Sequence, residues 1–243
     1  MTNDTILVIG ASSELARSTI RLIDKPCTTI LAHYHSRGLA LNNMKAEIQG
    51  RMLSFRADLS KEQEWERLIV SMRDYDPPSK MVLFAAPRAK QRRFKDLSWG
   101  EFSDQLAVQV GASQRLIREY LPSMCKQEYG KIIFVLSSVL NGKVPSRMAD
   151  YVTAKYAYLG LMKCLVAEYS SKGIRINAVS PSMVDTGFLA DLPRRAVEFS
   201  AEAHPLSRIA TPEDVAPLIS FLLSPDSDYI SGSNIPITGG LDF

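Results

Sequence analysis

The feature that most constrains the fold of this chain is a regular alternation between short apolar runs and longer amphipathic stretches. Seven runs of four to six residues are rich in isoleucine, valine and other apolar residues. Runs of this kind, apolar throughout and separated by helix-length segments, are typical of parallel strands covered by helices on both faces. The predicted strands are Ile6–Ile9, Thr28–Ala32, Met52–Phe55, Met81–Ala85, Lys131–Leu136, Ile174–Val179 and Asn234–Ile237.

Capping residues mark where the intervening helices begin. Ser98 precedes Glu101 by three residues, which is the spacing of a capping box. Thr211 and Pro212 supply an N-cap hydroxyl followed by a proline at the first helical position. The sequence therefore predicts an α/β chain with a doubly wound, seven-stranded parallel sheet, a Rossmann fold with helices on both faces. The helices are predicted to begin near Ser13, Leu39, Lys61, Gly100, Ala149 and Thr211.

Composition and charge exclude several other classes of protein. The 29 basic and 26 acidic residues give a net charge of +3 without a dense basic stripe, so we expect no nucleic-acid partner. The three cysteines are odd in number and far apart, which is typical of reduced thiols in a cytoplasmic protein with no metal site. The first residues do not resemble a signal peptide, and no apolar run could span a membrane.

The loops after the strands are where ligands bind in such sheets, and the first of them holds small residues. Gly10, Ser12 and Ser13 lie between a strand and a helix, where phosphate can approach backbone N–H groups. The segment has only one glycine and does not match the regular dinucleotide pattern. An ordinary strand-to-helix turn with a serine N-cap is the competing interpretation.

The end of the second predicted strand bears on the choice of nucleotide. An acidic residue here would bind the adenosine ribose and select NAD, but the chain has His33, Ser36 and Arg37 in this region. Arg37 can pair with a 2′-phosphate, which favours NADP and leaves NAD as the alternative; a solvated Arg37 stays open as well. Asp58, after the third strand, either contacts the adenine or caps the next helix. His33 and His35 alone are weak evidence for a metal.

The strongest chemical signal is Ser138 followed thirteen residues later by Tyr151 and then by Lys155. Tyr151 and Lys155 are four residues apart on a predicted helix, so their side chains share one face. A lysine ammonium beside a phenol is expected to lower the pKa of the phenol and to make it a usable acid or base. Taken alone, a chance tyrosine–lysine pair on a helix is the alternative, but its place after Ser138 in an α/β pattern argues against chance.

These residues carry a resemblance to the short-chain dehydrogenase/reductase family, closest to its 3-oxoacyl-[acyl-carrier-protein] reductase-like branch. The matching segments span essentially the whole chain: Ser138, Tyr151–Lys155, Asn177–Thr186, Pro205–Arg208, Thr211–Ala216 and Gly239–Gly240. The resemblance implies that Tyr151 donates the proton, that Ser138 orients the carbonyl and that Lys155 binds the nicotinamide ribose. Gln109 aligns with the family's fourth catalytic residue, an asparagine.

The resemblance also implies one domain spanning residues 1–243, with cofactor binding mainly in about 1–130 and catalysis and substrate binding in about 131–243. Val184 and Thr186 would hold the nicotinamide carboxamide. The complete set expected to contact the cofactor is Gly10, Ser12, Ser13, Glu14, Leu15, His33, Ser36, Arg37, Asp58, Leu59, Ala85, Ala86, Pro87, Tyr151, Lys155, Pro181, Val184 and Thr186.

The chain departs from the family pattern in three segments. Glu14 and Ala16 replace two glycines of the first turn, so a carboxylate comes near the cofactor phosphates or ribose. Phe84–Pro87 replaces an Asn-Asn-Ala-Gly segment, which removes amide partners and fixes φ at Pro87. Gln109 keeps the amide of the usual asparagine but adds a methylene. These departures indicate a divergent member of the family.

Basic residues in three loops around the expected crevice suggest an anionic substrate. We expect Arg88, Arg92, Arg93, Arg147 and Arg194 to attract a carrier-bound or small-molecule ketone with a negative charge. Solvated basic loops without a ligand are the alternative. Competing functions are a sugar, polyol or secondary-metabolite dehydrogenase and a non-catalytic nucleotide-binding scaffold or sensor. Apolar faces on two long helices, with the resemblance, suggest a homotetramer.

Overall fold

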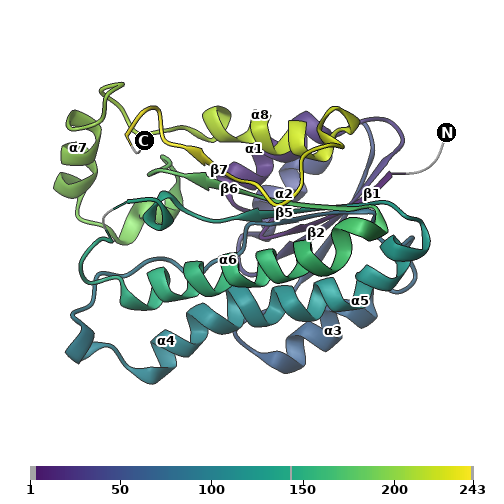
Figure 1. Ribbon diagram of the computed structural model, residues 1–243, viewed down its shortest axis with the longest axis horizontal. Coiled ribbons are helices and arrows are strands. Elements are labelled where there is room, and N and C mark those ends of the chain that lie inside the picture. Colours follow the sequence, from purple (N-terminus) through teal and green to yellow (C-terminus); the bar gives the residue numbers. More distant parts are fainter. Residues whose placement is uncertain (1–3, 143, 242–243) are drawn as a thin grey trace.

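The computed structural model describes residues 4–142 and 144–241, and a seven-stranded parallel sheet lies at its centre (Figure 1). The spatial order is β3-β2-β1-β4-β5-β6-β7, so the chain starts in the middle of the sheet and builds outward in both directions. The predicted doubly wound sheet is confirmed. The strands are β1 Asp4–Ile9, β2 Thr28–Tyr34, β3 Arg51–Arg56, β4 Lys80–Leu83, β5 Gly130–Val135, β6 Ile174–Pro181 and β7 Asn234–Ile237.

The strand β4 ends at Leu83, two residues earlier than predicted, because the next residues pack against the first turn. Gly10 has a φ of +83°, and a Cβ on it would lie 2.9 Å from the backbone nitrogen of Ala85. Only glycine adopts this backbone conformation without cost and also allows so close an approach. The loops after β1 and β4 are thereby held against each other.

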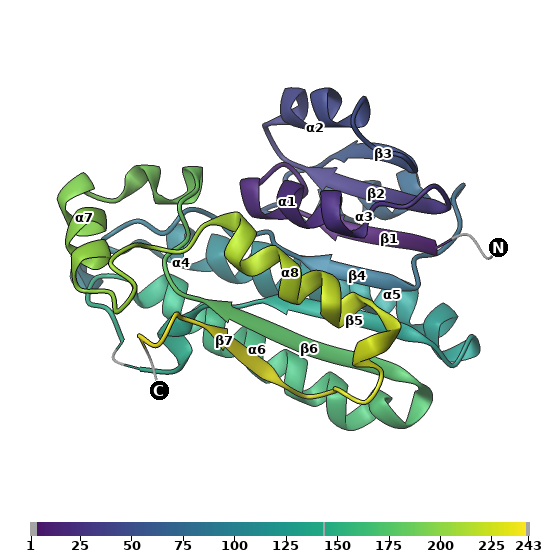
Figure 2. The ribbon, with the colours of Figure 1, turned by 90° about the horizontal axis from the view of Figure 1, so that it is seen from above.

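Two helical layers cover the two faces of the sheet (Figures 1 and 2). Alternate strand residues feed two separate cores, as Leu7 and Val8 on adjacent positions of β1 illustrate. Every predicted helix start lies within one residue of an observed start or N-cap. On one face lie α1 Glu14–Ile23, α2 Gly38–Lys45 and α8 Pro212–Leu223, and on the other lie α3 Glu62–Met72, α4 Trp99–Leu106, α5 Ala112–Lys126 and α6 Ala149–Tyr169.

The two capping signals found in the sequence are confirmed. The Ser98 hydroxyl accepts from the backbone N–H of Glu101, whose carboxylate returns to Ser98, and this pair starts α4. Thr211 and Asp214 form the same arrangement at the start of α8, with Pro212 at the first helical position. Reciprocal caps of this kind satisfy backbone donors that a helix start otherwise leaves unpaired.

Two features of the helices escape the sequence analysis. A π-helical segment, η2 Ala107–Gly111, joins α4 to α5 and contains Gln109. The segment after Thr186 folds into a further helix, α7 Arg194–Glu202, beyond the carboxyl ends of the strands (Figure 1). Both flank the edge of the sheet where ligands are expected. Short 3₁₀ helices are η1 Phe94–Asp96, η3 Ser138–Leu140, η4 Ser170–Lys172, η5 Gly187–Asp191 and η6 Pro225–Ser227.

Candidate active site

A single cleft of about 1000 Å³ lies beyond the carboxyl ends of the strands and collects most of the residues that the sequence singled out. All eighteen residues expected to contact the cofactor line it, together with Ser138. Its volume is at the upper end of the range for ligand pockets. Loops from both halves of the chain therefore meet in one cavity, as the doubly wound topology requires.

The first turn presents the N-terminus of α1 to this cleft. The Ser13 hydroxyl accepts a hydrogen bond from the backbone N–H of Ala16 and caps the helix. The positive end of the helix dipole and the backbone N–H groups at this end have the chemistry that suits a phosphate. The N-cap that the sequence analysis offered as an alternative is present, and it is compatible with phosphate binding.

His33 anchors this turn through hydrogen bonds to the backbone. Its Nδ1 accepts from the backbone N–H of Gly10 at 3.2 Å, so its proton lies on Nε2, which donates to the carbonyl of Ala57 at 3.1 Å. Burial lowers the pKa of His33 to about 4, so the ring is neutral at physiological pH. Both ring nitrogens bond to backbone, which leaves His33 a positioning role at the cleft wall.

An ion pair joins the first turn to the segment that follows β2 at one end of the cleft. The Arg37 guanidinium donates to Glu14 Oε1 at 3.0 Å. The segment η5 approaches this pair, because a Cβ on Gly187 would lie 2.7 Å from Nη2 of Arg37 and 3.2 Å from Glu14 Oε1. Glu14, which replaces a glycine of the family pattern, thus orients the one arginine at this end of the described lining.

Tyr151 and Lys155 lie on the cleft-facing side of α6, and both are buried. The Lys155 ammonium donates to the carbonyl of Val135 at 2.8 Å and lies 5.5 Å from the centroid of the Tyr151 ring. Burial lowers the pKa of Lys155 to about 7. The lysine is therefore fixed to the end of β5, beside the ring of the tyrosine.

The phenol of Tyr151 differs from the expectation in the direction of its pKa shift. Its pKa is raised, because burial favours the neutral form and only the hydroxyl of Ser137 opposes this effect. The prediction that Lys155 lowers the pKa of Tyr151 is therefore wrong for this geometry. Ser137 interacts with the phenol, whereas the predicted Ser138 begins η3 and also lines the cleft.

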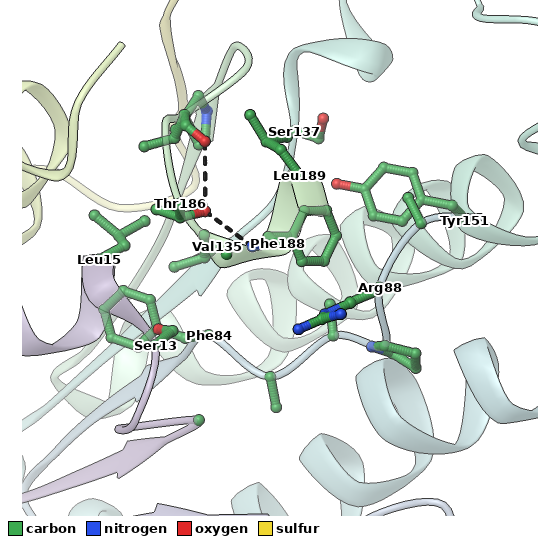
Figure 3. Close-up of a pocket in the computed structure, with 18 of the residues that line it drawn as sticks. Ser13, Leu15, Phe84, Arg88, Val135, Ser137, Tyr151, Thr186, Phe188 and Leu189 are labelled. Atoms are coloured by element: carbon green, nitrogen blue, oxygen red, sulfur yellow. Dashed lines mark hydrogen bonds between the residues drawn. The ribbon is translucent and has the colours of Figure 1, made fainter. Parts of the chain in front are cut away.

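The segment after β6 forms a roof over the tyrosine (Figure 3). The Thr186 hydroxyl caps η5 by accepting from the backbone N–H of Phe188 at 3.4 Å, and it donates to the carbonyl of Val184. The Phe188 ring packs against Tyr151 with a centroid distance of 6.0 Å. This apolar contact shields the phenol from water, which accounts for the direction of its pKa shift.

Gln109 does not line the cleft; it lies beneath the loop that follows β4. Its side-chain amide donates to Gln105 Oε1 at 2.8 Å, and Gln105 in turn donates to the carbonyl of Pro87 at 3.4 Å. Both glutamines are almost fully buried. The Oε1 of Gln109 has no partner within the described residues, and a buried water would satisfy it.

The five arginines expected to bind an anion are not equivalent. Arg88 lines the cleft and forms an ion pair with Asp191 at 3.4 Å. Arg92 instead pairs with Glu101. Four of the five arginines lie outside the described lining of the cleft, namely Arg92, Arg93, Arg147 and Arg194. Of the residues predicted to bind an anion, Arg88 is therefore the one that lies in the described lining.

Sequence reasoning missed several residues of the cleft. Ser137 was passed over because the spacing to Tyr151 favoured its neighbour, although both serines follow the same strand. Ser200 lines the cleft from α7 and His204 from the turn that follows it, and no capping side chain marks the start of this helix in the sequence. Phe84 lines the cleft directly after β4, where its position in the loop was the available signal.

Among residues 4–142 and 144–241, no group of three or more histidine, cysteine, aspartate or glutamate side chains is arranged to hold a metal ion. Within the same described ranges, no helix has the length and apolar character needed to cross a bilayer.

Known proteins resemble this chain over most of its length. The family model for enoyl-(acyl carrier protein) reductase matches residues 10–242. The mouse protein named dehydrogenase/reductase SDR family member 4 is 30% identical over 80% of this chain and 72% of its own length. Acetoacetyl-CoA reductase of Allochromatium vinosum is 25% identical over 97% of each chain.

A solved structure extends the comparison to the fold. A putative NAD(P)-dependent gluconate 5-dehydrogenase from Beutenbergia cavernae, with NADP bound at low occupancy, superposes with a TM-score of 0.88. It is 25% identical in sequence and covers 99% of this chain and 97% of its own.

Proposed function

Because the chain belongs to the short-chain dehydrogenase/reductase family and is an oxidoreductase, we propose that it reduces a ketone to a secondary alcohol with NADP as cofactor. We further propose a 3-oxoacyl thioester, bound to coenzyme A or a carrier protein, as the substrate. The observation that carries the proposal is the buried, neutral phenol of Tyr151 facing the Ser137 hydroxyl inside the cleft.

The cleft fits a dinucleotide by the chemistry of its donors. The free N–H groups at the start of α1 suit a pyrophosphate, and the left-handed turn at Gly10 lets the backbone come close to it. Arg37, rather than an acidic residue, lies at the end of β2, which suits the 2′-phosphate of NADP. The similar structure with NADP bound supports the same choice, with NAD as the alternative.

The protein's own residues supply the proton side of the reaction. When bound, the reduced nicotinamide supplies a hydride to the carbonyl carbon. The Tyr151 phenol, kept protonated by burial, then donates its proton to the carbonyl oxygen. The Ser137 hydroxyl, beside the Ser138 to which the family resemblance assigns this role, donates a second hydrogen bond to that oxygen and orients it. The roof formed by Phe188 limits the access of water.

Lys155 and the family's other residues complete this proposal. Lys155, held at Val135, would bind the nicotinamide ribose next to Tyr151, and Val184 and Thr186 would hold the carboxamide. The chain would act as one domain, with the cofactor mainly on residues 1–130 and the substrate mainly on residues 131–243. We also propose assembly as a homotetramer, supported by the exposed apolar side chains of Trp99 and Tyr156 on α4 and α6.

A second candidate is a dehydrogenase of a sugar acid. The similarity to a putative gluconate 5-dehydrogenase favours it, because the carboxylate of such a substrate suits the arginine in the cleft. The two candidates share the Tyr151 chemistry and differ only in the substrate. Reduction of 5-ketogluconate in place of a 3-oxoacyl thioester would therefore select the second candidate.

The test follows NADPH and NADH oxidation at 340 nm with acetoacetyl-CoA, crotonyl-CoA and 5-ketogluconate. We expect turnover of acetoacetyl-CoA with NADPH and a loss of about 100-fold or more in kcat for Tyr151→Phe, because the acid is removed while the ring remains. A preference for crotonyl-CoA would mean reduction of a carbon–carbon double bond. Turnover that survives in Tyr151→Phe would contradict the proposed acid.

A further inference from the structure

We propose that Arg88 is the residue that selects anionic substrates. In the absence of substrate its guanidinium pairs with the Asp191 carboxylate, which a substrate anion replaces on binding. The proposal rests on the proposed function and deepens it by naming the substrate class, which is a ketone carrying a phosphate or carboxylate group. Its structural basis is the position of Arg88 in the cleft and its ion pair with Asp191.

Arg88 is placed where a substrate group would meet it. It follows Pro87 in the loop after β4 and lines the same cavity as Tyr151 and Phe188 (Figure 3). The other two strong bases of the described lining are assigned to the cofactor by the proposed function, Arg37 to the 2′-phosphate and Lys155 to the nicotinamide ribose. Arg88 is therefore the cation that remains for a substrate anion.

The ion pair between Arg88 and Asp191 is weak. Its only hydrogen bond runs from Nη1 to Oδ1 at 3.4 Å, and about two-fifths of each side chain is exposed. By contrast, Arg208 holds Asp214 with two hydrogen bonds of 2.6 and 2.8 Å. A long, single-contact pair near solvent contributes little stability, so a substrate anion can replace Asp191 at small cost.

The guanidinium of Arg88 also keeps the geometry that recognises an anion. It has five N–H donors, and the pair with Asp191 uses one of them. The remaining donors can form the two parallel hydrogen bonds that phosphate and carboxylate groups accept. Asp191 lies outside the lining of the cleft, whereas Arg88 lies in it, so an anion inside the cleft would draw the guanidinium inward.

The backbone of Arg88 is anchored independently of this pair. Gln105 donates to the carbonyls of Pro87 and Arg88, at 3.4 and 3.5 Å, from a buried position on α4. The loop therefore stays in place when the side chain changes its partner. Asp191 is the last residue of η5, the segment that carries Phe188 over Tyr151. When a substrate anion replaces Asp191 at Arg88, the end of this segment therefore loses its ion pair.

The test compares ketone ligands that carry anionic groups with neutral ligands that share the reacting ketone. Acetoacetyl-CoA and the neutral acetoacetyl-N-acetylcysteamine share the ketone and the thioester, and their binding to the enzyme saturated with NADP⁺ is measured by calorimetry. We expect Arg88→Ala to weaken binding of the coenzyme A ester about tenfold or more and to leave the neutral ester unchanged. Arg88→Lys should fall between, because it keeps the charge but not the planar fork.

Two further variants separate the proposal from simpler explanations. Asp191→Asn should tighten binding of the coenzyme A ester, since it removes the competitor. Arg67→Ala is the matched control, because this exposed arginine pairs with Glu64 on α3 and lies outside the described lining of the cleft. A keto acid and its methyl ester, 4-oxopentanoate and methyl 4-oxopentanoate, form a second pair that tells carboxylate from phosphate recognition.

The outcomes distinguish this inference from the proposed function. Equal weakening of the charged and neutral ligands by Arg88→Ala, or binding of no anionic ligand by the wild type, would overturn the anion site. Oxidation of NADPH by the neutral ester would still sustain the ketoreductase in those cases. Binding of an anionic ligand that depends on Arg88, without any oxidation of NADPH, would instead support the anion site and contradict the proposed reaction.

Discussion

The hydroxyl of Ser137 interacts with the phenol of Tyr151 and opposes the rise of its pKa, whereas no such interaction is found for the neighbouring Ser138 among the described residues. We therefore predict that Ser137→Ala lowers kcat for the ketone by about 100-fold or more, the effect of removing one oriented donor from a developing oxyanion. Ser138→Ala is the matched control and should change kcat by less than about fivefold. A larger loss in Ser138→Ala would return the role to the residue that the sequence spacing favours.

Lys155 should reduce the stability of the folded protein near neutral pH. Its pKa falls from 10.5 to about 7 on burial, so between these values the unfolded chain holds a proton that the folded chain has lost. Wild-type stability consequently rises with pH across this range. Lys155→Met should gain on the order of a few kcal/mol below about pH 7, and the gain should vanish towards pH 10.5.

Urea unfolding of the wild type and Lys155→Met across this pH range measures the difference in the free energy of unfolding. A gap between the two proteins that stays constant with pH would show that the ammonium is not the cause.

His33 should make the fold sensitive to acid. Its pKa is lowered from 6.5 to about 4, so the stability that depends on the neutral ring is complete above pH 6.5 and is lost as the pH falls to about 4. The loss should amount to about 3 kcal/mol, since each pKa unit corresponds to about 1.4 kcal/mol. His33→Gln should lose this pH dependence while being less stable at neutral pH; parallel pH profiles of unfolding for the two proteins would contradict the assignment.

The pair formed by Arg37 and Glu14 should set the choice of nucleotide. Arg37→Ala should raise KM for NADPH about tenfold and leave KM for NADH nearly unchanged, because only NADPH carries the 2′-phosphate. Glu14→Gln should shift the ratio in the opposite direction by releasing Arg37 from its partner. Steady-state kinetics with both nucleotides measures the ratio, and an equal change for NADH and NADPH would argue for a purely structural pair.

The fold was predictable because its signals are local. Continuous apolar runs identify strands buried on both faces, and β7 has the bounds that the sequence predicts, Asn234–Ile237. Helix starts follow from side chains that cap backbone N–H groups, as at Ser98 and Thr211. Both signals depend on residues close together in the chain, so they survive without knowledge of the tertiary structure. The helix α7 lacks both and was missed.

The site was predictable in its residues but not in its contacts. The loops that line the cleft follow from topology, but which of two adjacent serines faces Tyr151 depends on how the chain turns after β5. Arg37 and Glu14 are 23 residues apart, and Arg88 and Asp191 are 103 apart, so only the assembled sheet brings each pair together. The shift of the Tyr151 pKa likewise depends on burial beneath Phe188, which no spacing reveals.

Because Gln105 on α4 donates hydrogen bonds to the loop after β4, this loop and α4 must be transferred together when segments are exchanged between related proteins. A loop stabilised by its own side-chain amides can be transferred between related proteins alone. The segment Phe84–Pro87 instead depends on the hydrogen bond from Gln105 to the Pro87 carbonyl, and Gln109 donates to the side chain of Gln105. Grafting an Asn-Asn-Ala-Gly segment here would place new donors beside Gln105, which already donates to the carbonyls of Pro87 and Arg88. A chimaera with a close relative should therefore keep function only when both segments come from one parent.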